Sequence, residues 1–596
     1  MARVGAKYLG NDCCEFSLWA PLLNQVALKI VSPQERIIPL QKSAGGYWRL
    51  RLSKIPPGTL YYYLVNDSKR LPDPASFYQP KGVHGPSQVI DQSGFNWGDG
   101  AWPGIPLAEM IIYELHVGTF TPQGTFAAII PRLPELKKLG VNTIELMPVA
   151  QFPGKRNWGY DGTCPFSVQN SYGGPGGFKT LVNEAHQAGL AVILDVVYNH
   201  LGPEGNYLAE FGPYFTSKYV TPWGKAVNFD DKGNGGVRNY FIQNSRHWFD
   251  HYHIDALRLD AIHGIFDQSK KHILRELSEK TDRFSKSKGR KFYLIAESDL
   301  NQERVVRDRS KGGYGVHAQW NDDFHHALHT ILTGEKKGYY QDFGKIEQLE
   351  KAYGQGFVYS GQYSAYREKR HGTSSKNIPA SRLVVFTQNH DQVGNRLAGE
   401  RLSQLVSFEA LKLAAGAMLV APYIPLLFMG EEYAENIPFY FFVDFGDPGL
   451  IKAVREGRQK EFSAFGWDQP IPDPQVQKTF DRSKIDWRKR NSGKHQVMLK
   501  YYQRLLSLRR DIPALSHLSK KNLKVSKLAD RTILLERWHL KSRVWCIMNF
   551  GKEIVKSNLP KKAVKIMDSS DTIWSGPGAL EKAINPLSLV LYEVSK

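Results

Sequence analysis

The chain has 596 residues, a formal net charge of +20 and 42% hydrophobic residues, enough for several domains with a sizeable core. Lys and Arg residues are spread along the sequence rather than gathered with aromatic residues into a basic stripe, so we expect no nucleic-acid partner. No apolar run approaches the about 20 residues of a membrane span, and the N-terminus lacks the apolar region of a signal peptide. Together with four scattered cysteines, this predicts a cytoplasmic protein with no membrane partner.

Two parts of the chain carry the pattern of antiparallel β-structure. In residues 1–95 apolar and polar positions alternate, as at Phe16, Leu18 and Ala20, and turns with Gly or Pro separate the runs. Alternation with a period of two residues is typical of strands that bury one face. We therefore predict an N-terminal β-sandwich over 1–95, similar to immunoglobulin-like and carbohydrate-binding modules. Residues 511–596 show the same alternation and predict a smaller antiparallel β domain.

Between these parts, residues 96–510 alternate short apolar runs with helical stretches. Such alternation predicts βα units and a fold of the α/β class. The stretch 202–234 is rich in Gly, Pro and aromatic residues and too long for a simple connection, so we expect a loop excursion over the barrel mouth. Eight strand-like segments predict a (β/α)8 TIM barrel; they are 110–115, 142–147, 192–197, 256–259, 292–296, 316–320, 383–386 and 425–428.

Four apolar runs end abruptly in polar or charged residues. Because the carboxyl ends of barrel strands meet at one mouth, we expect Asp260, Glu297 and Asp391 to converge in one pocket. Three carboxylates without a cysteine or metal-ligand cluster favour hydrolysis of a glycosidic bond over phosphoryl or hydride transfer. The four runs are AVILDVVYNH (191–200), ALRLDAIH (256–263), FYLIAESD (292–299) and LVVFTQNHD (383–391).

A retaining glycosidase needs an ionised carboxylate and a protonated carboxyl group about 5 to 5.5 Å apart. Arg258 lies two residues before Asp260 on one strand and projects to the same face, where its charge would keep Asp260 ionised as the nucleophile. Glu297 follows an apolar run whose burial would raise its pKa, which suits a general acid. Asp391 would hold sugar hydroxyls and favour a distorted ring. A single carboxylate at a strand end is more often a cap or an ion-pair partner, but the joint occurrence of all three favours catalysis.

The four runs resemble the ordered signature regions of the α-amylase superfamily, glycoside hydrolase family 13. The resemblance implies Asp260 as nucleophile, Glu297 as acid/base and Asp391 as transition-state stabiliser. Along nearly its full length the chain is most similar to the trehalose-releasing hydrolases of this superfamily. They cleave the α-1,4 bond next to a terminal trehalose on a malto-oligosaccharide, and act after a maltooligosyltrehalose synthase. The substrate-binding residues that the resemblance implies are Tyr160, His200, Arg258, His263, Trp320, Asp322, Asp323, His325, His390, Gln392 and Arg396.

Several alternatives share these residues. A glycogen branching enzyme has the same carboxylates but passes the glycosyl intermediate to a sugar instead of water. A debranching enzyme is a third possibility. A catalytically inactive glucan-binding protein is a fourth, although the complete carboxylate set argues against it. Within the 202–234 excursion, we expect Trp223 to pack against the trehalose end of the substrate; the alternative is that Trp223 only anchors the loop.

No cofactor and no metal are expected. His325, His326 and His329 have a spacing that resembles metal ligands, but they lack the glutamate of the zinc-protease motif. Many amylases hold a structural calcium near the asparagine equivalent to Asn199. Residues 198–234, however, carry no surplus acidic cluster that would complete the oxygen-rich shell that Ca²⁺ needs.

Overall fold

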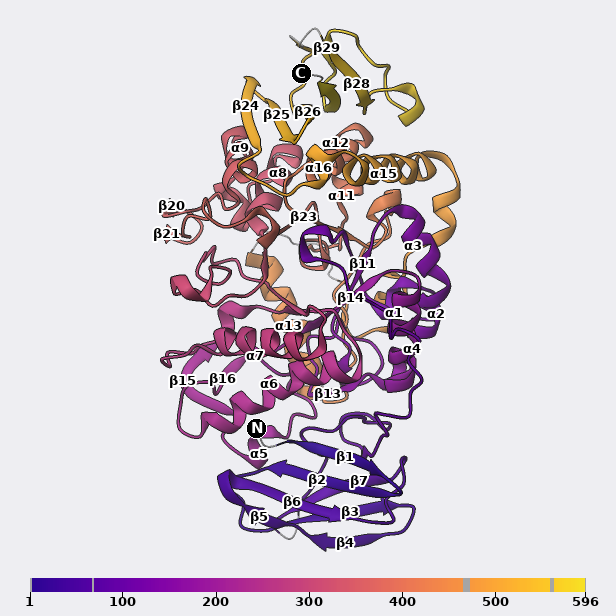
Figure 1. Cartoon of the computed structure of the whole chain (residues 1–596), viewed down its shortest axis with the longest axis vertical. Coiled ribbons are helices and arrows are strands. Elements are labelled where there is room, and N and C mark those ends of the chain that lie inside the picture. Colours follow the sequence, from indigo (N-terminus) through magenta and orange to yellow (C-terminus); the bar gives the residue numbers. More distant parts are fainter. Residues whose placement is uncertain (1–2, 67–68, 465–471, 558–561, 595–596) are drawn as a thin grey trace.

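The computed structural model describes residues 3–66, 69–464, 472–557 and 562–594. The molecule is elongated, with a β-sandwich at one end, a closed parallel barrel in the middle and an antiparallel sheet at the other end (Figure 1). This arrangement confirms the predicted fold class, a TIM barrel with β-structure on both sides. The domain boundaries 1–95, 96–510 and 511–596 remain predictions.

The N-terminal sandwich consists of two antiparallel sheets. Phe16 of one sheet meets Tyr61 of the other edge to face, with ring centroids 5.0 Å apart, and both side chains are fully buried. The alternating apolar positions thus form the core between the sheets. One sheet has the order β1 (Gly5–Gly10), β2 (Cys13–Trp19), β6 (Tyr47–Leu52), β5 (Gln41–Ser43); the other has the order β4 (Arg36–Pro39), β3 (Val26–Ser32), β7 (Leu60–Val65), β8 (Lys69–Leu71), with β9 (Ser87–Gln88) beside β7.

Eight parallel strands close into the barrel in chain order. Each falls on one of the predicted segments, and the segment 316–320 holds the shortest strand. Apolar side chains such as Ile112, Ile193 and Ile295 fill the interior and are fully buried, as in other closed barrels. The strands are β10 (Ile112–Leu115), β11 (Thr143–Leu146), β14 (Ala191–Val196), β17 (Ala256–Leu259), β18 (Tyr293–Ala296), β19 (Ala318–Trp320), β22 (Leu383–Phe386) and β23 (Ile424–Phe428). Among the helices are α4 (Gly174–Gln187), α6 (Asn234–His251), α7 (Ile273–Lys288), α8 (Asp322–Thr333) and α12 (Phe408–Leu419).

The stretch 202–234 forms an excursion with secondary structure of its own. It contains the short helix α5 (Leu208–Phe211) and an antiparallel hairpin of β15 (Phe215–Thr221) and β16 (Gly224–Val227). At the hairpin tip, the Trp223 backbone N–H donates to Thr221 Oγ1 at 3.1 Å. The Trp223 ring stacks on His200, with centroids 4.7 Å apart. The hairpin therefore reaches the C-terminal end of β14, where the predicted site lies.

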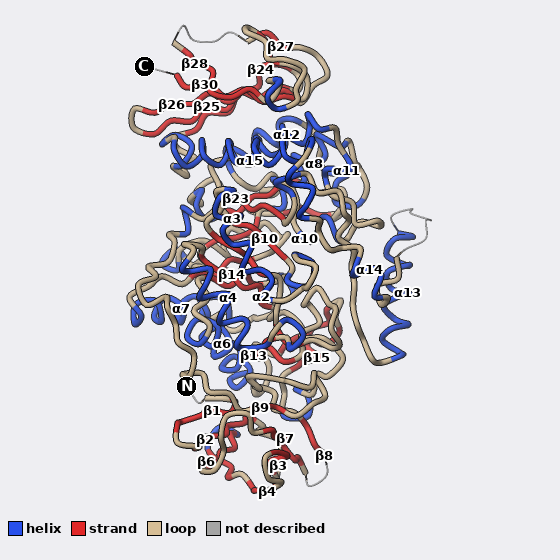
Figure 2. The backbone as a smooth tube through the Cα atoms, turned by 90° about the vertical axis from the view of Figure 1, so that its right-hand side faces the viewer, coloured by secondary structure: helices blue, strands red, loops and turns tan. Residues whose placement is uncertain are grey.

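The C-terminal sheet covers the far side of the barrel. Figure 2 shows it lying over α12 and α15 (Gly493–Asp511). The buried Lys412 of α12 fixes this contact, because its ammonium group donates to the backbone oxygens of Ser569 and Trp574 at 2.6 and 2.9 Å. The sheet order is β24 (Leu523–Ala529), β25 (Thr532–His539), β26 (Ser542–Asn549), β30 (Ser588–Val594), β28 (Ala563–Asp568).

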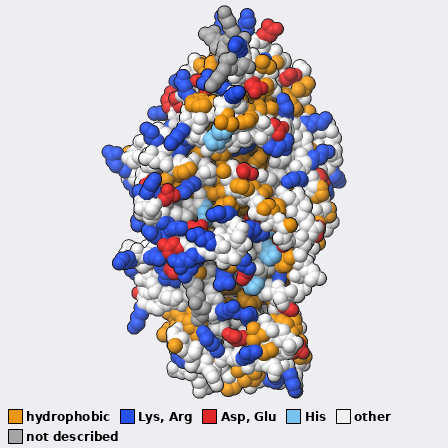
Figure 3. Space-filling view, viewed as in Figure 1, with side chains coloured by type: hydrophobic (Ala, Val, Ile, Leu, Met, Phe, Trp, Pro, Cys, Tyr) orange, Lys and Arg blue, Asp and Glu red, His pale blue; other side chains and the backbone are white. Residues whose placement is uncertain are grey.

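The surface carries its positive charge in a dispersed form. Lys and Arg side chains are spread over the whole face seen in Figure 3, among acidic and apolar patches. Of the helices in the described ranges, none has an apolar stretch long enough to span a bilayer.

Candidate active site

Asp195, Arg258 and Asp260 form the centre of the site at the C-terminal ends of β14 and β17. Asp195 and Arg258 are register partners on these neighbouring strands. Arg258 Nη1 donates to Asp195 Oδ2 at 2.6 Å and to Asp260 Oδ1 at 2.7 Å, and the Arg258 side chain is fully buried. Charge-assisted hydrogen bonds of this kind are short and strong, so the arginine fixes both carboxylates in place.

Asp260 is held in its ionised form. A further hydrogen bond comes from Asn199 Nδ2, which donates to Asp260 Oδ2 at 2.8 Å. Burial acts to raise the pKa of Asp260, but the charge of Arg258 and the neighbouring His200 outweigh burial and bring the pKa below its ordinary value. The carboxylate is therefore charged at neutral pH.

Glu297 directly follows β18, and its pKa is shifted in the opposite direction to that of Asp260. Burial raises the pKa of Glu297 well above its ordinary value; Arg258 opposes this shift, and nearby carboxylates, Asp260 first among them, reinforce it. The Arg258 Nη2 atom lies 3.7 Å from Glu297 Oε2, which is outside hydrogen-bond distance. The raised pKa favours the protonated form of Glu297, which is the form that can donate a proton.

Ala261 links the two strand ends. Its backbone N–H donates to Glu297 Oε2 at 2.6 Å, and the next N–H, of Ile262, donates to the backbone oxygen of Glu297 at 3.0 Å. Ala261 has a φ of +36°, in a left-handed region that residues with side chains rarely adopt. Strain of this kind persists where the surroundings impose it, most often at functional sites.

Tyr160 and His390 form one wall of the site. The Tyr160 hydroxyl donates to Asp195 Oδ2 at 2.7 Å and lies 2.7 Å from His390 Nε2. Glu114 of β10 accepts the backbone N–H of His390 at 3.1 Å and also bonds its Nδ1. Burial acts to lower the pKa of His390, but the charges of Asp391 and Glu114 raise it to about 9. His390 is therefore a cation at neutral pH.

Asp391 is the most open of the three carboxylates. Its side chain is 40% exposed, compared with 11% for Asp260 and 12% for Glu297. It lies in the first turn of α10 (His390–Gly394), where its backbone N–H donates to the side chain of the N-cap residue Asn389 at 2.9 Å. Its Oδ1 lies 3.4 Å from His390 Nε2, so Asp391 is the one of the three carboxylates that solvent reaches most easily.

The two predicted tryptophans lie at different depths. Trp320 is buried, and Arg258 Cζ lies 4.4 Å from the centre of its ring. Trp223 is 46% exposed, and its ring is parallel to that of His200, at an angle of 4°. His200 in turn lies 3.0 Å from the backbone oxygen of Tyr160 through Nε2. Trp320 thus packs against the guanidinium, whereas nearly half of the Trp223 side chain is accessible at the edge of the site.

Four further residues predicted to bind substrate have protein partners of their own. Their side chains hold the loops around the site, and a role in direct sugar contact remains a prediction for each. Asp323 accepts from Asn301 Nδ2 and from the N–H groups of Val358 and Tyr359. His325 bonds the backbone oxygen of Thr387 and the hydroxyl of Tyr340. The Gln392 side chain accepts from Asn389 N, and Arg396 pairs with Glu335.

Asp322 and His263 lie beside residues that sequence reasoning missed. His263 Nδ1 is 3.8 Å from Asp299 Oδ1, and Arg367 donates to Asp299 Oδ2 at 2.7 Å. Asp322 shares a small cavity of about 20 Å³ with Asp299 and Arg367. Burial and the charges of neighbouring carboxylates, with Asp299 first among them, raise the pKa of Asp322 to about 7.

Arg367 belongs to no motif that could have identified it, and Glu114 lies on the predicted first strand but carries no signal there that points to His390. Arg367 lies 68 residues from Asp299, and Glu114 lies 276 residues from His390. Only the closed barrel and the hairpin of β20 (Gln362–Ser364) and β21 (Lys369–His371) bring these partners together.

Comparisons with known proteins place the site in a family. The family model described as alpha amylase, catalytic domain, matches residues 74–221. A malto-oligosyltrehalose trehalohydrolase of Saccharolobus solfataricus is 48% identical over 84% of this chain and 86% of its own length. A 1,4-alpha-glucan branching enzyme of Bacillus caldolyticus is 29% identical over 70% of this chain and 64% of its own length.

The fold agrees with the sequence comparison. A crystal structure from Salmonella typhimurium, of an alpha amylase candidate, superposes with a TM-score of 0.91 at 37% identity and covers 99% of both chains. The identity to the trehalohydrolase extends over the barrel strands that carry Asp260, Glu297 and Asp391 and well beyond them, since it covers more than two thirds of the chain. The chain belongs to the malto-oligosyltrehalose trehalohydrolase family, within the α-amylase superfamily.

Proposed function

We propose that this chain hydrolyses the α-1,4-glucosidic bond next to the terminal trehalose of maltooligosyltrehalose, with retention of configuration, and releases free trehalose. The observation that carries the chemistry is a pair of carboxyl groups on either side of Arg258, with Asp260 Oδ1 2.7 Å from its Nη1 and Glu297 Oε2 3.7 Å from its Nη2. The pKa of Asp260 is lowered and that of Glu297 is raised, which favours an ionised Asp260 and a protonated Glu297. Retaining glycosidases need this pair of states. The trehalose end is inferred from the relatives, of which one at 48% identity is named as a trehalohydrolase.

In the first step, Asp260 attacks the anomeric carbon of the glucose that precedes trehalose. Glu297 gives its proton to the bridging oxygen, the bond from that oxygen to the anomeric carbon breaks, and trehalose leaves. The product is a glycosyl ester on Asp260. In the second step Glu297, now ionised, takes a proton from water as the water attacks the same carbon, and the glucan is released. Asp391 and the cation His390 are proposed to hold hydroxyls of the distorted, oxocarbenium-like ring.

Incubation with two substrates distinguishes this activity from branching. With maltooligosyltrehalose we expect free trehalose as a product, and with amylose we expect no new α-1,6 branches. Branches formed from amylose without trehalose release would instead select the branching enzyme, to which the identity is lower. No product with either substrate would leave an inactive glucan-binding protein.

Two features of the biological setting belong to the same proposal. We infer a cytoplasmic location from four cysteines that are all free, as expected in a reducing compartment. We also infer that a synthase, which forms the trehalose end of the malto-oligosaccharide, acts before this enzyme, because its substrate must already carry that end.

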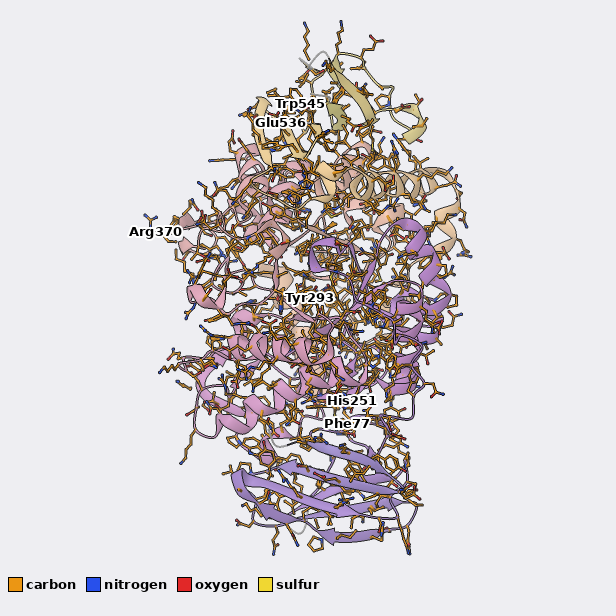
Figure 4. All side chains as sticks on the ribbon, in the orientation of Figure 1. Phe77, His251, Tyr293, Arg370, Glu536 and Trp545 are labelled. Atoms are coloured by element: carbon orange, nitrogen blue, oxygen red, sulfur yellow. The ribbon has the colours of Figure 1, made fainter. Side chains whose placement is uncertain are left out.

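Trp223 is proposed to pack against the trehalose unit, because its exposed ring lies at the edge of the site. Trp223→Ala should therefore lower kcat/KM for maltotriosyltrehalose by about tenfold while changing that for maltopentaose much less, since a shaped contact discriminates by about 1 to 3 kcal/mol. Trp545→Ala, at the far C-terminal end in Figure 4, is the matched control and should leave both values unchanged. Equal losses with both substrates would show that Trp223 only anchors the hairpin.

Glu114 is proposed as a positioning residue that keeps His390 charged. Glu114→Gln removes a negative charge beside His390, whose pKa is about 9 with Glu114 in place, so the pKa of His390 should fall. The cation would then be lost at lower pH, and the imidazole titration of His390, followed by NMR, should move to lower pH. The exposed Glu347→Gln serves as the control. A His390 titration that stays at the same pH in Glu114→Gln would contradict this role.

Activity is expected to need no metal. The Asn199 amide is occupied by protein groups, because Nδ2 donates to Asp260 and Oδ1 lies 2.6 Å from His200 Nδ1. Within the described ranges, no group of three or more His, Cys, Asp or Glu side chains is arranged to hold a metal ion. Treatment with EDTA should therefore leave the rate of trehalose release unchanged. A loss of activity that calcium restores would refute this prediction.

A further inference from the structure

A large cavity lies where the sandwich meets the barrel, away from the carboxylates. Its volume is about 820 Å³. Strand β1, the segment 91–97 and the helices α6 and α7 line it. Figure 4 labels Phe77 and His251 at this junction, the first from the loop before β9 and the second from the end of α6. Cavities at domain junctions are common places for small ligands.

Aromatic rings form much of the cavity wall. Phe77 stacks on His247, with centroids 4.9 Å apart and an angle of 14°. Trp97 stacks on His253 at 3.8 Å, and Phe95 meets Trp97 edge to face at 4.8 Å. Phe77, Phe95 and Trp97 are all only partly buried. Their accessible faces suit a ligand that contains a ring.

The cavity also carries positive charge that no acidic group balances. Arg3, Lys7, Lys280 and Arg283 line it, and in the described part of the chain their side chains form no ion pair or hydrogen bond. Its two acidic residues are already engaged. Asp91 accepts from Ser93 N and Oγ at 2.8 and 2.7 Å, and Asp250 pairs with Lys288 at 2.6 Å.

Three arginines around the active site, in contrast, are paired with carboxylates. Arg258, Arg367 and Arg396 each bond a carboxylate at 2.6 or 2.7 Å. Since unpaired cations beside a concave surface attract anions, the cavity is charged for a ligand with several negative oxygens, and phosphate is the common group of that kind.

We propose that this cavity binds a small phosphorylated molecule with a ring, whose phosphate meets the four unpaired cations and whose ring packs on Phe77, Phe95 and Trp97. A nucleotide and a sugar phosphate share this chemistry. The site is separate from the hydrolytic site, and the proposal does not depend on the function proposed above.

Isothermal titration calorimetry on the full chain tests the charge of the site, with ATP, glucose 6-phosphate and inorganic phosphate as probes. ATP or glucose 6-phosphate, or both, should bind. The one that binds more tightly shows whether the ligand is a nucleotide or a sugar phosphate. Lys280→Gln/Arg283→Gln should weaken that binding about tenfold or more, because it removes two charge-assisted contacts. The control Lys270→Gln/Lys286→Gln removes two exposed charges outside the cavity and should bind like the parent.

Phe95→Ala tests the ring contact and should weaken ATP or glucose 6-phosphate but not inorganic phosphate. No binding by either ring-containing probe would overturn the proposal. Equal losses in both double variants would overturn it as well, since they would mean general attraction to a basic surface. Inorganic phosphate binding as tightly as the other probes would also contradict it. Trehalose release should be unchanged in all these variants, so failure here is distinguishable from failure of the proposed hydrolysis.

Discussion

Asp260→Asn should abolish nearly all turnover of maltooligosyltrehalose while leaving the protein folded. The amide cannot form the glycosyl ester, and losses for groups of this kind are at least about 10²-fold to 10⁴-fold in kcat. Asn is nearly isosteric with Asp, so the packing around Arg258 and Asn199 should persist, and a thermal unfolding scan should show a folded protein. The measurement is the initial rate of trehalose release.

The matched control for this variant is Asp530→Asn, an aspartate whose side chain is 93% exposed in the C-terminal sheet region. It should retain the parent rate. An Asp260→Asn variant with near-full activity would contradict the assignment of the nucleophile, whatever its stability.

Glu297→Gln should be almost as damaging, but selectively so. Gln cannot give a proton to the leaving oxygen, so hydrolysis of maltooligosyltrehalose should slow by about 10²-fold to 10⁴-fold. A glucoside with a nitrophenyl leaving group needs no proton to depart, so its first step should slow far less. The variant should therefore accumulate the glycosyl ester from the activated substrate and show a burst of nitrophenol.

The pH profile gives an independent readout of Glu297. Burial raises its pKa well above the ordinary value, which extends the acid form to higher pH, and this form is lost as the pH rises through the raised pKa. The parent enzyme should lose kcat/KM on the alkaline side, and Glu297→Gln should show no loss from this group. Equal slowing of natural and activated substrates would contradict its role as general acid.

The barrel and its carboxylates could be predicted because both depend on local sequence. Buried parallel strands read as continuous apolar runs, and residues that follow such strands meet at one mouth. Asp260 and Glu297 therefore needed only the strand assignments of 256–259 and 292–296. The pairing of Arg258 with Asp260 followed from the period of two residues along a strand.

The remaining parts of the site depend on contacts between distant segments. Asp322 and Asp323 are neighbours at the start of α8, but the Asp323 carboxylate accepts hydrogen bonds from the backbone N–H groups of Val358 and Tyr359. The path of the 339–371 segment determines which of the two carboxylates accepts these backbone hydrogen bonds. In the same way, Arg396 bonds Glu335, 61 residues away, and its predicted contact with the substrate remains a prediction.

The central claim is that this site releases trehalose from maltooligosyltrehalose with retention. Proton NMR of maltotriosyltrehalose hydrolysis, recorded before mutarotation, tests the release of trehalose and the retention of configuration in one experiment. We predict free trehalose together with maltotriose that appears first as its α-anomer. Maltotriose that appears first as the β-anomer, or maltose or glucose released in place of trehalose, would contradict the account.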